Sequence, residues 1–507
     1  MASPSSNPLS ESEQIVQLQK KLAWAELKIQ ALEEQLRLQR IKKYGPGSEK
    51  LSSAQLELLD LEPGVSSTDI QTESERGPLP TSVKQPRDRK HPGRQELPAS
   101  LPRVERVIAC TPEQCTCKTC GQAKAVIGYD ISEQLDVEPA KYLVLVTKRE
   151  KRACKRCEEG GVVAAPVPER IIEKSLVSNR VVIDTVVAKY SDHLPLYRQS
   201  AILERDAGIQ IGRATMDGWV MRVGELLIPL VEVMRRELLG GSYIQADETP
   251  VDVQLHDGRG QNHQAYLWQY GQPGGGVVFD FRSGRGREGP KEFLGQFEGI
   301  LQTDGYGAYD RVGGPKLAHA GCWAHSRRKF CDAVKLNPSD VVATRIVKLI
   351  DELFGIDAVA RAENLDDTAR HALRLQSAQP LVETIRGEVE AARDASLPSS
   401  ALGKAAHYTL SQWRKLTRFL EHPELELSNN LAENSMRPVA LGRKNWIHVG
   451  SQQAGPKVAA ILSIVETCRR MKIPIRDYLA AVLPGIADAS IQSLAALTPA
   501  AWAAQQS

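Results

Sequence analysis

The stretch Ser242-Tyr-Ile-Gln-Ala-Asp-Glu-Thr-Pro250 decides how the middle of the chain folds. Its first five residues form an apolar, β-prone run, and Asp247 stands at the end of that run. A second run of the same kind, Gly299-Ile-Leu-Gln-Thr303, ends at Asp304. If these two strands are neighbours in one sheet, both carboxylates leave the same edge of it. The pattern therefore predicts an α/β core that carries two acidic groups at one place.

A third carboxylate, Glu433, follows Ser428-Asn-Asn430, whose side chains are typical of helix N-caps. We expect Glu433 in the first turns of a helix that packs against the sheet. Carboxylate oxygens are hard ligands that suit Mg²⁺ or Mn²⁺. Three such groups can hold two metal ions, which in-line chemistry at a phosphodiester requires. Glu248 and Asp310 are alternative ligands, although Glu248 is expected on the opposite face if the strand continues.

Composition places the chain among ordinary soluble globular proteins. It has 507 residues, 42% hydrophobic and 25% charged, with a net charge of +3, so three or more domains are expected. No run of about 18 apolar residues predicts a membrane span, and the N-terminus lacks the apolar core of a signal peptide. We expect a cytoplasmic protein that is nucleoid-associated when bound to DNA. Basic residues gather in 84–106 and 141–157 and suit either phosphate contacts or solvated loops.

Two Cys-x-x-Cys pairs predict a structural zinc site of four thiolates, formed by Cys117, Cys120, Cys154 and Cys157. Cys110 and Cys115 could substitute as ligands. The motif Cys322-Trp-Ala-His325 could also bind a metal, but no second pair is visible nearby. A packed cysteine with a hydrogen-bonded histidine is the alternative interpretation.

Residues 12–41 repeat with a period of seven, with Ile15, Leu22, Ile29 and Leu36 at one heptad position. This pattern predicts a short coiled coil and hence a homo-oligomer. A single amphipathic helix packed on its own domain remains the alternative. Residues 45–100 are rich in Gly, Pro, Ser and charge and are typical of a linker.

Residues 176–239 have a helical pattern. A helix over 197–205, the turn at Gly208 and a second helix from 211 are typical of a helix-turn-helix, with Arg213 and Thr215 as candidate DNA contacts. Further candidates for phosphate contact are basic residues near the carboxylates: Arg327, Arg328, Arg437, Arg443 and Lys444. Arg437 could instead pair with Glu433 one helical turn away.

Short apolar runs predict strands at 243–245, 251–255, 265–270, 276–281, 300–303 and 317–320, with a run of the same type at 142–147. A helix is expected over 290–297, and residues 326–420 and the last 55 residues are expected to be mostly helical.

Several motifs in order resemble the TnpC-type transposases of the insertion-sequence family numbered sixty-six. They are Tyr44–Lys50, His91–Arg94, the two cysteine pairs, Lys189–Gln199, Gly321–Phe330 and Arg437–Trp446. The resemblance implies an RNase H-like core with a DDE triad, which falls on Asp247, Asp304 and Glu433. It also implies a helical insertion, an N-terminal dimerising helix, a zinc-binding module and a helix-turn-helix.

The expected fold is multidomain α+β: an RNase H-like α/β core with a helical insertion, an N-terminal coiled coil, a zinc-ribbon-like module and a helix-turn-helix. The expected segments are a coiled-coil helix (1–44), a basic linker (45–103), a zinc-binding module (104–165), a DNA-binding helical region (166–239), the first part of the core (240–331), the insertion (332–425), the Glu-bearing part of the core (426–455) and a helical tail (456–507).

The resemblance further implies a DNA transposase that binds the inverted repeats of its own element, cleaves them and joins the 3′ hydroxyl ends to target DNA. Two Mg²⁺ or Mn²⁺ ions, a structural Zn²⁺ and accessory proteins of the same element belong to this expectation. A DNA-binding regulator without activity, a nuclease without strand transfer and a structural partner are the alternatives.

Overall fold

The computed structural model describes residues 11–44, 103, 122, 141–153, 162–254, 262–446 and 448–506. The four cysteines predicted to bind zinc lie outside the described residues. An antiparallel pair of strands, β1 (Lys151–Ala153) and β2 (Val162–Ala164), falls within the predicted zinc-binding region. The strand predicted at 142–147 is wrong, because residues 141–150 have no regular structure.

The heptad-patterned segment is a single helix, α1 (Glu11–Tyr44). Its first-position residues Ile15, Leu22, Ile29 and Leu36 are between 56% and 61% exposed. This helix therefore leaves a row of large apolar side chains in contact with water.

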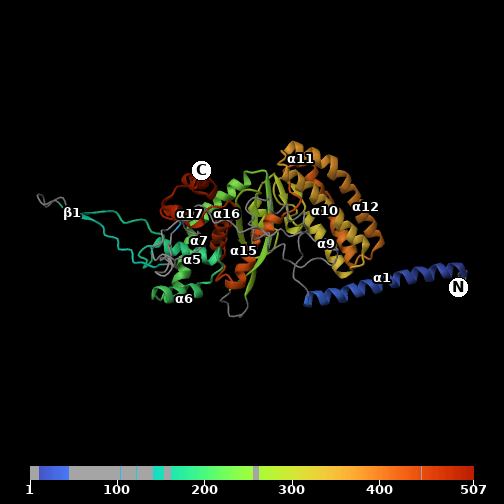
Figure 1. The fold of residues 1–507 in the computed structure, drawn as a ribbon, viewed down its shortest axis with the longest axis horizontal. Helices are drawn as coiled ribbons and strands as arrows, with labels where there is room; N and C mark the ends of the chain where they lie inside the picture. Colours follow the sequence, from blue (N-terminus) through green and yellow to red (C-terminus); the bar gives the residue numbers. More distant parts are fainter. Residues whose placement is uncertain are drawn as a thin grey trace, which may run out of the picture. The chain divides into compact units, whose positions relative to one another are not determined.

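A mixed sheet lies between the helices before and after it in the chain (Figure 1). It has five strands in the order β5-β4-β3-β6-β7. The strands are β3 (Tyr243–Val253), β4 (His263–Gly271), β5 (Val277–Arg282), β6 (Ile300–Gln302) and β7 (Ala318–Ala320). β3, β4 and β5 are antiparallel, whereas β3, β6 and β7 run parallel. The expectation that the strands leading to Asp247 and Asp304 are neighbours is confirmed, because β3 pairs with β6.

β3 differs from the prediction because it is one continuous strand through Asp247 and Pro250. Proline lacks an N–H and is tolerated only where no ladder partner needs one. The carbonyl of Pro250 accepts a hydrogen bond from Arg443 of a helix at 2.6 Å, on the side away from β4. In a strand, the N–H and C=O of one residue point to the same side. The missing N–H therefore falls where β3 has no strand partner, since β6 pairs only with Tyr243–Gln245.

The helices before the sheet belong to the same hydrophobic core as the sheet itself. They are α5 (Asn179–Tyr190), α6 (Leu196–Ala207) and α7 (Arg213–Leu239). The predicted helix, glycine turn and helix are present, and Gly208 has the left-handed φ of +68°. However, α7 has 27 residues and packs along its length against α16 (Ala454–Arg470), so this region is not a separate domain.

α16 also belongs to the core rather than to a peripheral tail. Its Thr467 hydroxyl accepts a hydrogen bond from the Val277 backbone N–H at 2.9 Å, and its Ser463 hydroxyl accepts one from Phe279 at 2.8 Å. These side chains satisfy the outer edge of β5, which has no further strand. Beyond α16 lie α17 (Ile475–Val482), η4 (Ile486–Asp488), α18 (Ile491–Leu494), η5 (Ala495–Leu497) and α19 (Pro499–Gln506).

The crossing of α7 and α16 depends on Gly224. A Cβ atom built there would lie 2.7 Å from the Lys457 backbone carbonyl oxygen. We expect Gly224→Ala to destabilise the fold by about 1–3 kcal/mol, because neither backbone can move freely. Gly218→Ala on the same helix meets nothing within 4 Å and is expected to be neutral or stabilising, since alanine favours helix. Urea unfolding of both variants tests this, and equal midpoints would contradict it.

Helices that follow β7 form a second hydrophobic core, and α9, α10 and α12 lie side by side there (Figure 1). The segments are α9 (Trp323–Leu336), α10 (Val341–Ala362), α11 (Asp367–Leu373), the π-helix η2 (Arg374–Ala378), α12 (Gln379–Ala395), α13 (Ala401–Ser411), α14 (Trp413–Leu416) and η3 (Thr417–Leu420). Tyr243 and Ile300 of the sheet belong to this core. We call residues 323–420 the helical insertion; it begins at α9, somewhat before the predicted 332.

A buried ion-pair network joins the insertion to the chain that returns to the sheet. The Arg374 side chain is 1% exposed and forms an ion pair with Asp357 at 2.6 Å. It also donates hydrogen bonds to four backbone carbonyls, those of Phe419, His422, Pro423 and Leu425. Arg370 bonds Asp357 and Glu426. One guanidinium therefore holds the backbone of 419–425 in place.

The network predicts a loss of stability in acid. Burial opposes the charge on Asp357, but Arg374 and Arg370 outweigh it and hold the pKa of Asp357 below its ordinary value. A carboxylate whose pKa is depressed in the folded state stabilises the fold at pH values above its unfolded-state pKa of about 4. This contribution is lost as the pH falls through the folded-state pKa. We expect the free energy of unfolding of the parent to approach that of Asp357→Asn below about pH 4. Urea midpoints of both proteins between neutral pH and pH 3 test this; a constant difference would contradict it.

The part of the chain that the structure describes contains no helix long and apolar enough to cross a membrane.

Candidate active site

The three predicted carboxylates lie close enough together for the charges of Glu433 and Asp304 to act on Asp247. β3 and β6 pair in register at Gln245 and Gln302. Asp247 lies two residues further along β3, on the same face as Gln245. Asp304 lies two residues after Gln302, just past the end of β6, where its negative charge raises the pKa of Asp247. Glu433 lies in the first turn of α15 (Asn430–Trp446), as predicted, and α15 packs against β3. The site therefore lies where the sheet, α15 and the helical insertion meet.

The electrostatics of Asp247 show how closely the acidic groups approach one another. Burial raises the pKa of Asp247 well above its ordinary value, and the negative charge of Glu433 raises it further. Glu248 and Asp304 act in the same direction, whereas His325 acts against them. Burial and the neighbouring carboxylates therefore oppose ionisation of Asp247, and a bound cation would offset both effects.

Two contacts orient Asp304 after the end of β6. Its Oδ1 accepts a hydrogen bond from the Tyr306 backbone N–H at 2.8 Å, which closes a local turn around Gly305, with a φ of +89°. Its backbone carbonyl accepts a bond at 2.6 Å from the Tyr408 hydroxyl of α13. The helical insertion thus directly supports the second aspartate.

Glu433 is held from the other side by α9. The Arg328 guanidinium donates to Glu433 Oε2 at 3.2 Å, and His325 Nδ1 lies 3.5 Å from Oε1. Burial lowers the pKa of His325, but the nearby Cys322 sulfur and Glu433 outweigh burial and raise this pKa to about 9. The Cys-x-x-His motif thus adjoins the carboxylate site.

A buried polar cluster behind the carboxylates fixes the approach to α15. Gln302 Nε2 donates to the carbonyls of Gly321 at 3.0 Å and Glu426 at 2.7 Å, while its Oε1 accepts from Gln245 at 3.0 Å. Gln245 also donates to the Ser428 carbonyl at 3.1 Å, and the Tyr243 hydroxyl bonds both glutamines. The backbone just before Glu433 is therefore tied to both aspartate-bearing strands.

Sequence reasoning missed these glutamines, although a signal was present. Gln245-Ala-Asp247 and Gln302-Thr-Asp304 repeat one pattern on the two parallel strands. A buried polar residue two positions before each aspartate shares its face and needs partners there.

Replacing Gln302 by leucine tests this cluster. The change leaves the carbonyls of Gly321 and Glu426 without their donor, and we expect a loss of about 2–4 kcal/mol in the free energy of unfolding. Gln264→Leu, at an exposed position of β4, is the control and is expected to change stability by less than about 0.5 kcal/mol. Similar urea midpoints for the two variants would show that the cluster does not hold the segment.

The donor set fits hard divalent cations. Buried polar atoms of Gln269, Asn429 and Asn434 have no hydrogen-bond partner among the residues that the structure describes. Gln269 pairs in register with Asp247, and the two asparagines flank Glu433. Buried polar groups of this kind are normally satisfied by water or an ion. Oxygen donors, excess negative charge and orphaned polar atoms together match hydrated Mg²⁺ or Mn²⁺.

The alternative ligands are engaged elsewhere. Glu248 faces the other side of the sheet, as predicted, where it accepts bonds from Arg285 at 2.6 Å and the Tyr309 hydroxyl at 2.9 Å. Asp310 pairs with Lys415 at 2.8 Å.

The predicted DNA-contacting side chains fall into two groups. Arg327 is buried and forms a two-point ion pair with Asp351, at 2.6 and 3.1 Å. Arg443 donates to Thr249 and Pro250 and fastens α15 to β3. These two guanidiniums therefore contribute to packing within the chain. Of the other predicted DNA-contacting residues, Arg213, Thr215 and Lys444 are exposed to solvent, and Arg328 and Arg437 are partly exposed.

A groove of about 550 Å³ is lined by residues from α5, α7 and α15. Arg213 at the start of α7 and Trp446 at the end of α15 both line it, as does Lys189 of α5. Trp446 also packs against Tyr190, with ring centroids 6.4 Å apart. Asp217 also lines the groove, so its charge is mixed, and its basic and aromatic side chains are of the kind that contact a nucleic-acid backbone.

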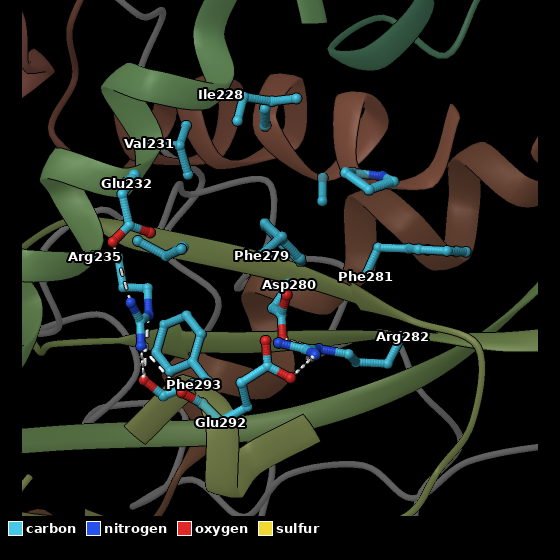
Figure 2. Close-up of a pocket in the computed structure, with 14 residues that line it drawn as sticks. Ile228, Val231, Glu232, Arg235, Phe279, Asp280, Phe281, Arg282, Glu292 and Phe293 are labelled. Atoms are coloured by element: carbon cyan, nitrogen blue, oxygen red, sulfur yellow. Dashed lines mark hydrogen bonds and ion pairs between the residues drawn. The ribbon is translucent and has the colours of Figure 1, made fainter. Parts of the chain in front are cut away.

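A second cavity, of about 310 Å³, lies between α7, β5, α16 and α8 (Glu288–Leu294). Figure 2 shows that its charged groups face one another: Arg282 bonds Asp280 and Glu292, and Arg235 bonds Glu232 and the Phe293 carbonyl. Its charges are thus compensated internally, in contrast to those around Asp247.

Comparison with known proteins agrees with this geometry. Residues 174–457, which contain the sheet, the insertion and all three carboxylates, match the model described as the Transposase IS66 family. The chain belongs to this family. Residues 31–106 match a domain described as the transposase C of IS166 homeodomain, and residues 114–158 match the zinc-finger binding domain of transposase IS66. The family thus supports the zinc-binding and DNA-binding features predicted from the sequence.

Three relatives come from Sinorhizobium fredii, and all three are described as uncharacterized. The protein y4qI is 33% identical over 85% of this chain and 79% of its own length. The protein y4jD is 34% identical over 81% and 82%, respectively. The protein y4hP is 29% identical over 94% and 88%. The similarity therefore extends over nearly the whole chain.

Proposed function

We propose that this protein is the DNA transposase of a bacterial insertion sequence and that Asp247, Asp304 and Glu433 form its DDE triad. The proposed reaction begins when water attacks a phosphodiester at the end of the element and releases a 3′ hydroxyl. That hydroxyl then attacks target DNA, forms a new phosphodiester and releases a 3′ hydroxyl of the target strand. The convergence of three carboxylates, with the charges of two raising the pKa of Asp247, is the observation that carries the proposal.

The carboxylates would hold two Mg²⁺ or Mn²⁺ ions, which activate the attacking oxygen and stabilise the leaving one when bound. The protein's own groups act by orientation. Arg328 steadies the carboxylate of Glu433, and the turn at Tyr306 fixes that of Asp304. Fixed positions matter because in-line displacement requires attacking and leaving oxygens in one geometry.

We further propose an RNase H-like identity for the core, supported by the five-stranded mixed sheet with carboxylates on its parallel strands. Arg213, Thr215 and the groove that Trp446 helps to line are proposed to contact the inverted repeats, together with Lys444, Arg328 and Arg437. Cys117, Cys120, Cys154 and Cys157 are proposed to bind the structural zinc. The exposed apolar row on α1 supports pairing of protomers through a coiled coil, since two ends must be cut in concert.

Strand transfer distinguishes this proposal from its alternatives. The purified full-length protein is mixed with end DNA that already carries a free 3′ hydroxyl, a supercoiled target plasmid and Mg²⁺. We expect end DNA joined covalently to the plasmid. Metal-dependent cleavage without joined products would favour a nuclease, and binding without any metal-dependent product would favour a regulator.

A further inference from the structure

The feature outside the proposed triad that carries most chemistry is a cluster of three different donor types. Cys322 stands directly before α9, His325 lies in the first turn of α9, and Glu433 lies in the first turn of α15. One ligand atom of each lies within 4.8 Å of those of the other two. The sequence offers only the Cys-x-x-His pair, and the fold supplies the third donor from more than a hundred residues away.

The spacing of the His325 and Glu433 atoms suits a shared metal ion better than a hydrogen bond. His325 Nδ1 lies 3.5 Å from Glu433 Oε1, and Nδ1 is buried with no hydrogen-bond partner among the described residues. A charge-assisted N–H···O bond would bring the two atoms to about 2.8 Å. Two ligands of one tetrahedral ion with bonds of about 2.0–2.3 Å lie roughly 3.3–3.8 Å apart.

The donor types select a different class of ion from the hard oxygens of the triad. Sulfur and imidazole nitrogen are ligands of Zn²⁺ and similar ions, whereas Mg²⁺ prefers carboxylate and water. Cys322 is buried, and its sulfur accepts a hydrogen bond from the Asn429 backbone N–H at 3.4 Å, which fixes the sulfur beside the start of α15. Three protein donors leave a fourth position of a tetrahedral ion open.

We propose that Cys322, His325 and Glu433 form a second metal site, which takes a zinc-class ion and shares Glu433 with the triad. An ion bound there withdraws Glu433 from the magnesium site, so zinc-class ions compete with Mg²⁺ and inhibit the reaction. The competition rests on the proposed function, whereas the binding of the ion does not.

Cobalt is the probe for this site, because Co²⁺ replaces zinc and absorbs light strongly when a thiolate binds it. The full-length protein, loaded with one equivalent of Zn²⁺ for the proposed four-cysteine site, is titrated with Co²⁺. We expect thiolate-to-cobalt absorption that saturates at about one ion per chain. Cys322→Ser should lose this absorption, and Cys331→Ser, a buried cysteine further along α9, should retain it. Absorption that persists in Cys322→Ser, or its absence in the parent, would overturn the proposal.

Two further variants keep the test decisive if Cys322→Ser fails to fold, which circular dichroism would reveal. His325→Gln and Glu433→Gln should each raise the cobalt dissociation constant at least about tenfold. Unchanged affinity in Glu433→Gln would overturn the sharing of that residue. Millimolar Mg²⁺ should also weaken cobalt binding, and no such effect would overturn the competition. All these readouts are independent of DNA cleavage, so a failure of the proposed function would be recognised separately.

Discussion

Replacing Asp247 by asparagine is expected to slow metal-dependent DNA cleavage about a thousandfold, equivalent to about 4 kcal/mol of transition-state stabilisation. Asparagine has nearly the same shape but carries no charge, so it removes a metal ligand without creating a cavity. Asp247 is the group on which burial and the charges of Glu433, Glu248 and Asp304 converge. The binding of a cation at this site therefore depends more on Asp247 than on a solvent-exposed carboxylate.

DNA binding should survive this change, because the exposed basic residues near Arg213 and Lys444 are unaltered. Asp252→Asn provides a matched control: it makes the same chemical change on the same strand, at an exposed position on the opposite face. We expect its cleavage rate within about a factor of two of the parent. The measurement is single-turnover cleavage of end DNA, with binding followed separately by fluorescence anisotropy. Cleavage retained in Asp247→Asn would refute the triad.

Replacing Asp357 by asparagine is expected to lower the free energy of unfolding by about 3–5 kcal/mol. Asp357 is 2% exposed and neutralises Arg374 and part of Arg370. Its loss leaves buried guanidiniums with too little negative charge, and desolvation then acts against them without compensation. The effect should reach the active site, because Arg374 holds the carbonyls of 419–425, just before the loop that leads to Glu433.

Glu390→Gln is the control for this second prediction. Its partner Arg386 lies one helical turn away on α12, with side chains 57% and 39% exposed, and such pairs contribute about 0.3–0.5 kcal/mol. Urea unfolding followed by tryptophan fluorescence compares the two variants. If Asp357→Asn shifts the urea midpoint as little as Glu390→Gln does, the network contributes little to stability.

Much of the fold was predictable because local patterns specify it. Period-two alternation and glycine turns located all five strands of the central sheet, and the N-cap residues before Glu433 located the start of α15. Asp247 was predicted as a site residue at the end of a strand, whereas β3 continues beyond it to Val253. The strand appeared broken at Pro250, since sequence alone does not reveal that its missing N–H faces a side without a strand partner.

Other parts depend on contacts between residues far apart in the chain, and these leave no local pattern. Arg327 has the sequence context of a DNA contact, yet Asp351 pairs with it inside the insertion. The carbonyl partners of Arg374 lie more than forty residues away. The nearness of His325 to Glu433 likewise follows from the docking of α9 beside α15. Charge and composition at a single position do not distinguish an exposed arginine from a buried one.

One measurement tests the central claim most directly: cleavage, in Mg²⁺ or Mn²⁺, of DNA that spans the boundary between the inverted repeat and its flank, by the parent and by Asp304→Ala. The account predicts breaks at the boundary that leave 3′ hydroxyl ends and disappear both in the variant and when the metal is chelated. Cleavage by Asp304→Ala at the rate of the parent would contradict the assignment of this site.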